Sequence, residues 1–251
     1  MSSTANGDGI TVVLVHGAFA DASSWNGVVE RLQAQGVEVT APPNPLRGIE
    51  YDSAYVASVL EETSGRVLAV GHSYGGAVIT NAAADAENVV GLVYVAAFAP
   101  DEGERLGDVE NGSKDSVLNS ALVQRHYPGK GGEPAVEFAI DPAKFRGAFA
   151  ADLPTAQTAV MAATQRPVAE LAFSEPSGHP AWKDRPSWAV VATGDKAAGT
   201  DVVRSMAERA GASITEVDGS HVIMISQPDV VAGVIMEAVA AVGSPAATAG
   251  G

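Results

Sequence analysis

The chain has 251 residues, enough for one large domain with a substantial buried core. Cysteine is absent, which excludes disulfides, thiolate metal sites and a cysteine nucleophile. The 15 basic and 30 acidic residues give a net charge of −15, which argues against nucleic acid and anionic membranes as partners.

Two types of element alternate over the first 100 residues. Short apolar, β-branched runs predict buried strands, and apolar residues at helical spacing predict helices between them. The strands are expected at 10–15, 37–41, 66–71 and 88–100, and the helices at 23–36, 52–65 and 73–86. Such alternation is typical of a parallel α/β sheet.

The pattern changes between residues 101 and 186. A polar stretch at 101–116 leads into short helix-like pieces that prolines or glycines separate. These pieces lie at 116–126, 133–139, 142–149, 155–164 and 167–173. Because about 85 residues are too many for a plain connection, we expect a helical cap inserted before the penultimate strand.

The alternation resumes after the insertion. Strands are expected at 187–194 and 213–217, and helices at 201–211 and 227–242. The fold class is therefore α/β, with a mostly parallel six-stranded sheet and helices on both faces. We expect a core made of 1–100 and 187–243, a helical cap over 101–186, and a disordered low-complexity tail at 244–251. The first residues lack the pattern of a secretory signal, which predicts a cytoplasmic protein.

One short motif, Gly71-His72-Ser73-Tyr74-Gly75, joins a predicted strand to a predicted helix. In that context G-x-S-x-G is typical of a nucleophile elbow, a sharp turn that projects the serine from the carboxyl edge of the sheet. Gly71 and Gly75 would remove side chains that otherwise collide across the turn. The motif predicts Ser73 as a nucleophile.

A serine nucleophile needs a base, and in this fold a histidine follows the last strand. His221 lies between the last predicted strand and the final helix, so we expect it to be the general base. The other histidines fall in turn motifs or in the insertion: His16, His72, His126 and His179.

Three aspartates at strand exits compete for the role of the triad acid. Asp195 follows the penultimate strand directly and is favoured. Asp101 follows the preceding long strand and stays open as the alternative. Asp218 lies too near His221 in sequence to orient it.

Developing negative charge on the substrate needs backbone N–H donors. The predicted donors are the amides of Tyr74, after the nucleophile, and of Ala18, after the first strand, with Phe19 as the alternative. For substrate binding we expect Phe19, Tyr74, Val222 and Trp182. Asp and His are not grouped at ligand spacing, so neither a metal site nor a cofactor site is expected.

Several stretches together resemble the α/β-hydrolase family, and in particular its branch of small plant-type esterases and hydroxynitrile lyases. They are VLVHGAFADASSW, VLAVGHSYGGAVI, LVYVAAFAPDEGE, VATGDKA and VDGSHVIMISQPDVVAGVI. The resemblance implies Ser73, Asp195 and His221 as a triad, a helical cap and no cofactor. The related lyases carry a lysine beside the catalytic histidine, where this chain has Val222 and Ile223. Lyase activity is therefore disfavoured. The loop GDKAAGTD after the penultimate strand also departs from the family pattern, which usually has a larger apolar residue and a proline there.

The sequence thus predicts a serine hydrolase that cleaves carboxylic esters of small to medium apolar substrates through an acyl-enzyme. C–C, lactone or thioester hydrolysis on the same triad is one alternative. A small-molecule binding protein or receptor with a vestigial triad is another, from a different class. The expected partner is a small ester, not nucleic acid or a membrane, and the chain is expected to be a monomer or homodimer.

Overall fold

The computed structural model describes residues 9–243, so the tail predicted at 244–251 lies outside the described residues. A central sheet of six parallel strands runs in the order β2-β1-β3-β4-β8-β9. The strands are β1 (Ile10–Val15), β2 (Glu38–Thr40), β3 (Arg66–His72), β4 (Val89–Val95), β8 (Ser187–Ala192) and β9 (Ser213–Val217). The predicted α/β fold class is confirmed.

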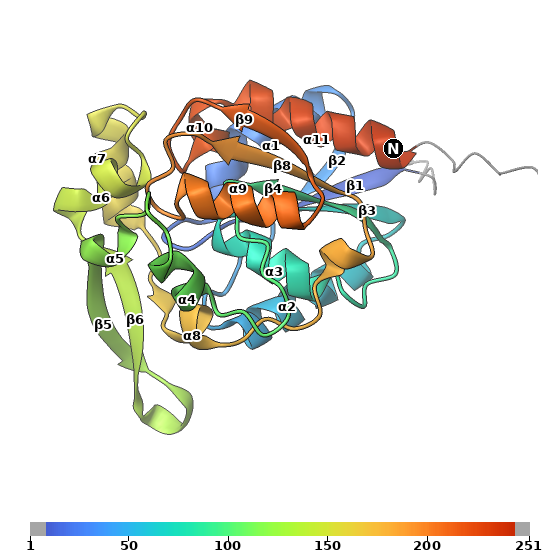
Figure 1. Cartoon of the computed structure of the whole chain (residues 1–251). Coiled ribbons are helices and arrows are strands. Elements are labelled where there is room, and N and C mark those ends of the chain that lie inside the picture. The colour runs from blue at the N-terminus through green and yellow to red at the C-terminus, as the bar shows by residue number, and fades with distance from the viewer. Residues whose placement is uncertain (1–8, 244–251) are drawn as a thin grey trace, which may run out of the picture.

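Helices cover both faces of this sheet (Figure 1). On one face α1 (Asn26–Ala34) packs against α11 (Pro228–Gly243), which also contacts β4 and β8. On the other face lie α2 (Ile49–Glu62), α3 (Tyr74–Ala82) and α9 (Thr200–Arg209). Right-handed crossovers explain this division. The chain steps from β1 through α1 to β2 at one edge of the sheet, and the crossovers that contain α2, α3 and α9 run toward the opposite edge.

The strands at the centre of the sheet are apolar on both faces because helices bury both sides. Val12 of β1 pairs with Leu68 of β3, and both side chains are fully buried. All six strands end at the same edge, so the loops after β1, β3, β8 and β9 meet there. Parallel α/β sheets place their sites at this carboxyl edge.

Residues between β4 and β8 form the inserted part of the chain. Its helices are α4 (Leu106–Asn111), α5 (Leu118–Ala121), α6 (Pro142–Phe149), α7 (Thr155–Thr164) and α8 (Leu171–Ser174). Its strands β5 (Leu122–Pro128), β6 (Pro134–Ile140) and β7 (Val168–Ala169) form a separate antiparallel sheet. Short helical turns complete the chain: η1 (Ala22–Trp25), η2 (Lys130–Gly132), η3 (Ala181–Lys183) and α10 (Ile223–Ser226).

The expectation that the insertion is helical throughout is wrong at the β5–β6 hairpin. Much of the helix-like pieces 116–126 and 133–139 is strand, with Leu122 opposite Ile140. Short apolar runs fit both periodicities, so their pairing partner decides the structure. Gly131 and Gly132, at φ of 76° and 86°, let the chain reverse between the strands. The hairpin projects away from the central sheet (Figure 1).

The long strand expected at 88–100 is also shorter than predicted. β4 ends at Val95, and Ala96 has a φ of 44°, which breaks the extended run. Residues 96–100 instead form a buried loop near the site. The apolar run therefore reflects burial rather than continued strand pairing.

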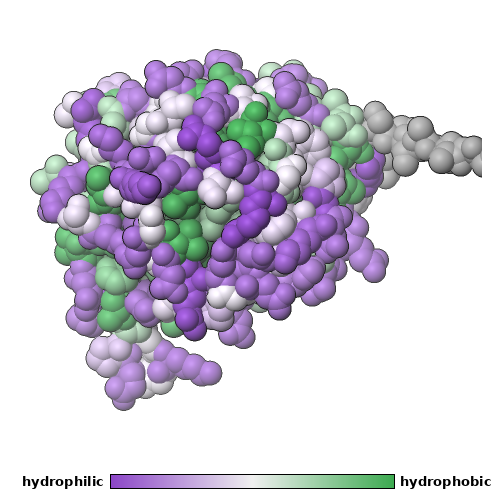
Figure 2. All heavy atoms as spheres, viewed as in Figure 1, coloured by the Kyte–Doolittle hydropathy of each residue, from purple (hydrophilic) through white to green (hydrophobic). Residues whose placement is uncertain are grey.

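The surface seen in Figure 2 is mostly hydrophilic, with small separate hydrophobic areas. Over residues 9–243, none of the helices has the length and apolar character that a membrane span requires.

Candidate active site

Ser73 occupies a strained turn between β3 and α3. Its backbone has φ 54° and ψ −124°, a conformation that side chains rarely adopt. A Cβ on Gly71 would lie 2.5 Å from the carbonyl oxygen of Gly75, and one on Gly75 would collide with the carbonyl oxygen of Val15. The glycines on both sides of Ser73 are therefore required for the chain to turn this sharply.

His221 and Asp195 meet at the same edge of the sheet. The Nδ1–H of His221 donates to Asp195 Oδ2 at 2.8 Å, and both side chains are 1% exposed. The other carboxylate oxygen of Asp195 accepts from the amides of Ala197 at 2.9 Å and Ala198 at 3.0 Å. These bonds fix the carboxylate, and Nε2 of His221 forms no hydrogen bond within residues 9–243.

The competing aspartates lie elsewhere. Asp101 forms an ion pair with Lys183 at 2.5 Å, and Asp218 accepts from the hydroxyl of Thr193. Among the described residues neither forms a hydrogen bond or ion pair with His221. The geometry therefore favours Asp195 over Asp101.

Ser73 and His221 line one cavity at the carboxyl edge. Among the described residues the Oγ of Ser73 makes no hydrogen bond. Catalytic hydrogen bonds are commonly long before substrate binds and shorten in the complex. The structure thus joins His221 and Asp195 by a hydrogen bond and places Ser73 in the same cavity as His221.

Two further histidines, read from the sequence only as turn residues, hold the site together. His72 donates from Nε2 to the carbonyl oxygen of His221 at 3.0 Å, and the two ring centroids are 4.7 Å apart. Burial keeps the pKa of His72 well below its usual value, so its ring stays neutral. The position of His72 within the G-x-S-x-G motif was the available signal for this role.

His16 supports the turn after β1 in a similar way. Its Nε2 accepts from the amide of Asn44 at 2.9 Å, and its Nδ1–H donates to the carbonyl oxygen of Gly17 at 2.9 Å. Burial lowers the pKa of His16 to about 4, which keeps the ring neutral. The turn that carries Ala18 is thereby fixed to the loop after β2.

The residues that carry the predicted oxyanion donors line the same cavity. Tyr74 begins α3, where the first N–H groups of a helix have no partner within the helix. Ala18 and Phe19 also line the cavity, and in the described part of the chain neither amide donates to a protein acceptor. The Tyr74 hydroxyl is engaged separately, donating to the buried Asp52 at 2.8 Å.

A scan against protein families matches the description "Alpha/beta hydrolase family" over residues 12–234. The chain belongs to this family. It is 33% identical over 98 residues to a pyrethroid hydrolase from Sphingobium wenxiniae, a stretch that covers 34% of this chain and 35% of that protein. The chain thus matches about a third of this curated relative's length.

Solved structures agree with the fold of this alpha/beta hydrolase. Polyneuridine aldehyde esterase superposes with a TM-score of 0.78 at 20% identity, covering 92% of this chain and 99% of that one. A pyrethroid hydrolase structure superposes with a TM-score of 0.73 at 22% identity, covering 94% of this chain and 100% of that one.

The cavity beside Ser73 is small and apolar in this hydrolase. Its volume is about 10 Å³, roughly the space that one water molecule needs. Its aromatic lining comes from Phe19, Tyr74, Phe98, Phe149 and Phe173. A substrate can enter only when some of these side chains move.

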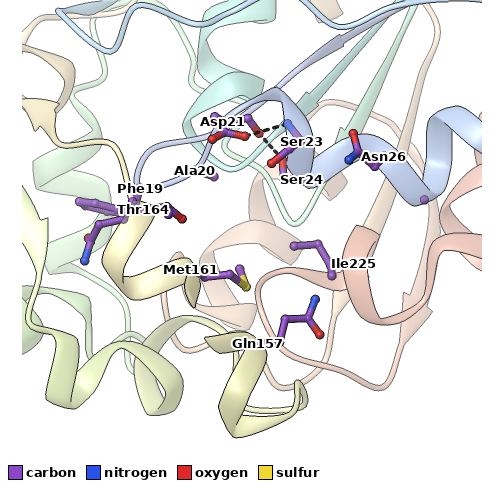
Figure 3. A pocket seen from close by; sticks show the side chains of 12 residues that line it. Phe19, Ala20, Asp21, Ser23, Ser24, Asn26, Gln157, Met161, Thr164 and Ile225 are labelled. Carbon is purple, nitrogen blue, oxygen red and sulfur yellow. Dashed lines mark hydrogen bonds between the residues drawn. The ribbon is translucent and has the colours of Figure 1, made fainter. Parts of the chain in front are cut away.

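Larger cavities adjoin this one across single aromatic side chains. Phe19 also borders a cavity of about 310 Å³, drawn in Figure 3 with Met161 of α7 and Ile225 on its wall. Phe173 also borders a cavity of about 540 Å³ in the insertion. We expect movement of either ring to open a path from Ser73 to space that can hold a small organic group.

Of the four predicted substrate-binding residues, Phe19 and Tyr74 line the cavity at Ser73. Val222 is fully buried beside His221 in sequence and is not part of the cavity wall. Trp182 lies on η3, where its indole N–H donates to the carbonyl oxygen of Pro100 at 3.0 Å. The structure therefore does not bring Trp182 to the cavity, because the insertion turns it toward the loop after β4.

Proposed function

We propose that this hydrolase cleaves carboxylic esters, with Ser73 as nucleophile, His221 as general base and Asp195 as the residue that orients it. The observation that carries the proposal is the buried 2.8 Å hydrogen bond between His221 and Asp195, next to a serine at φ 54°. Nucleophile, base and orienter in this chain order are typical of the fold. The family match supports hydrolysis as the reaction class.

The reaction follows from the positions of the groups. His221 takes the proton of Ser73 as its Oγ attacks the ester carbonyl, and the amides of Tyr74 and of Ala18 or Phe19 stabilise the oxyanion. His221 then protonates the departing alcohol and leaves an acyl group on Ser73. Water repeats the sequence and releases the acid.

The apolar cavity wall supports substrates with small to medium apolar groups near the carbonyl. One structural neighbour is named polyneuridine aldehyde esterase, which agrees with an ester as the substrate. Val222 and Ile223 next to His221 supply no ammonium group for lyase chemistry.

Turnover of p-nitrophenyl esters by wild type and Ser73→Ala tests this proposal. We expect the alanine variant to keep its fold and to lose turnover by several orders of magnitude, on the order of 10⁶-fold. Retained turnover in the pure variant would refute the assignment of Ser73 as the nucleophile.

A panel of thioesters, lactones and C–C substrates then ranks the bonds that the same triad cleaves. Absence of labelling by a fluorophosphonate would favour a binding protein over an enzyme.

A further inference from the structure

The segment Ser113–Val117 of the insertion lies against the loop that carries Asp195. The amide of Val117 donates to the carbonyl oxygen of Lys196 at 2.8 Å. The hydroxyl of Ser116 donates to the carbonyl oxygen of Ala197 at 2.6 Å. Two consecutive peptide groups directly after Asp195 are therefore held by the insertion and not by the central sheet.

The same segment also binds the start of α9. Ser113 Oγ donates to Asp201 Oδ1 at 2.6 Å, and the amide of Lys114 donates to Asp201 Oδ2 at 2.8 Å. In return the amide of Asp201 donates to Asp115 at 3.0 Å. Gly199, at φ 88°, permits this approach, because a Cβ there would collide with Ser113 Oγ. These bonds supply the support that the loose GDKAAGTD sequence lacks.

The peptide group between Ala197 and Ala198 connects this contact to the triad. Its carbonyl oxygen, on Ala197, accepts from Ser116, and its N–H, on Ala198, donates to Asp195 Oδ1 at 3.0 Å. The opposite carboxylate oxygen of Asp195 binds His221. A continuous path of hydrogen bonds therefore runs from Ser116 through Ala197 and Asp195 to the base.

Glu110 of α4 stands at the beginning of this path. Glu110 is 3% exposed, and its Oε1 atom lies 3.2 Å from Ser116 Oγ. A serine hydroxyl has one proton to donate. Because the 2.6 Å contact with Ala197 takes that proton, the 3.2 Å contact with Glu110 becomes a full hydrogen bond only when the carboxyl group carries a proton and donates to Ser116. A neutral Glu110 therefore fits this geometry better than an ionised one.

The surroundings of Glu110 agree with a neutral carboxyl group. Burial raises its pKa to about 7, whereas hydrogen bonds donated by Ser116 and by the backbone of Asn119 to an ionised carboxylate, and the charge on His221, act in the opposite direction. In the described part of the chain it forms no ion pair. The charged and titratable groups on the elements around it are Arg105, Asp108, Lys114, Asp115, Glu170, Lys196 and His221.

We propose that Glu110 is a positioning residue: its neutral carboxyl group, acting through Ser116, holds the Ala197 peptide and so keeps Asp195 aligned with His221. The inference rests on the proposed role of Asp195 and His221 in ester hydrolysis. An ionised Glu110 has no proton to donate and competes with Ala197 for the proton of Ser116. The alignment therefore weakens as pH rises through neutrality.

The test compares kcat and KM of Glu110→Gln and Ser116→Ala with wild type between about pH 6 and pH 9. We expect wild-type kcat to decline several-fold at the alkaline end, while Glu110→Gln, whose amide donates at every pH, shows no decline. Ser116→Ala should lower kcat about tenfold with little change in KM, as loss of one such hydrogen bond predicts. Ser58→Ala is the matched control, because that exposed hydroxyl on α2 donates locally to the carbonyl oxygen of Tyr55, away from the segment Ser113–Val117.

An equal alkaline decline in wild type and Glu110→Gln would overturn the proposal, and so would wild-type kcat in Ser116→Ala. The NMR signal of the His221 Nδ1 proton provides a readout that needs no substrate. It should shift in Ser116→Ala and, with rising pH, in wild type but not in Glu110→Gln. A signal that stays unchanged in Ser116→Ala contradicts the positioning role, whereas retained turnover in Ser73→Ala contradicts only the proposed reaction.

Discussion

Replacement of Asp195 by Asn probes the geometry of the triad most sharply. Asp195 Oδ1 accepts from the amides of Ala197 and Ala198, so the carbonyl oxygen of an asparagine would remain on that side. Its NH₂ group would then face His221 Nδ1 at the position of the present 2.8 Å bond. The imidazole would have to carry its proton on Nε2, where it cannot accept the proton of Ser73.

The structure also sets the size of this effect. Flipping the asparagine to restore the active tautomer would leave the two amides facing an NH₂ group. Each of the two unpaired buried donors costs about 1–3 kcal/mol, so the active arrangement lies about 2–6 kcal/mol higher. That free energy corresponds to a decrease in kcat between ~30-fold and ~10⁴-fold.

Initial rates on a p-nitrophenyl ester, with circular dichroism to verify folding, measure this decrease. Asp101→Asn serves as the matched control, because Asp101 follows a strand in the same way but pairs with Lys183. We expect it to retain kcat within about twofold, as is usual for a surface ion pair. A decrease of less than tenfold in Asp195→Asn, or an equal decrease in both variants, would refute this assignment of the acid.

Other variants give further predictions. Ser73→Gly should be about 1 kcal/mol more stable to denaturant than Ser73→Ala, because glycine relieves the strain at φ 54°; equal stabilities would contradict that strain. Phe173→Ala should raise kcat/KM for p-nitrophenyl octanoate relative to the butyrate by joining the adjoining cavities, and an unchanged ratio would argue against this path. Glu110 should favour the fold below pH 4.5 and lose that contribution as pH rises to about 7. The free energy of unfolding of wild type, relative to that of Glu110→Gln, should therefore fall by up to about 3 kcal/mol between pH 4.5 and pH 7. A difference that stays constant over this range would contradict the raised pKa.

The central sheet was predictable because its strands are encoded locally. Runs such as 10–15 and 66–71 are apolar, short and bounded by turn residues, so no distant contact is needed to recognise them. The β5–β6 hairpin was missed for the opposite reason: its residues pair only with one another and with β7. There the glycines at 129, 131 and 132 were the available signal.

The site was predictable to a similar degree. Ser73 lies in a distinctive motif, and His221 and Asp195 follow strands, so all three could be named from their positions along the chain. The choice between Asp195 and Asp101 depended on which loop reaches His221, which only the tertiary structure decides. Glu110 lies in a polar stretch, and its burial arises from contacts with residues far along the chain.

Mass spectrometry of the intact protein during turnover of a p-nitrophenyl ester tests the central claim most directly. We predict a single added acyl group, mapped by peptide analysis to Ser73 and absent from Ser73→Ala. Hydrolysis that proceeds without such an adduct, or with the acyl group on another residue, would contradict the account.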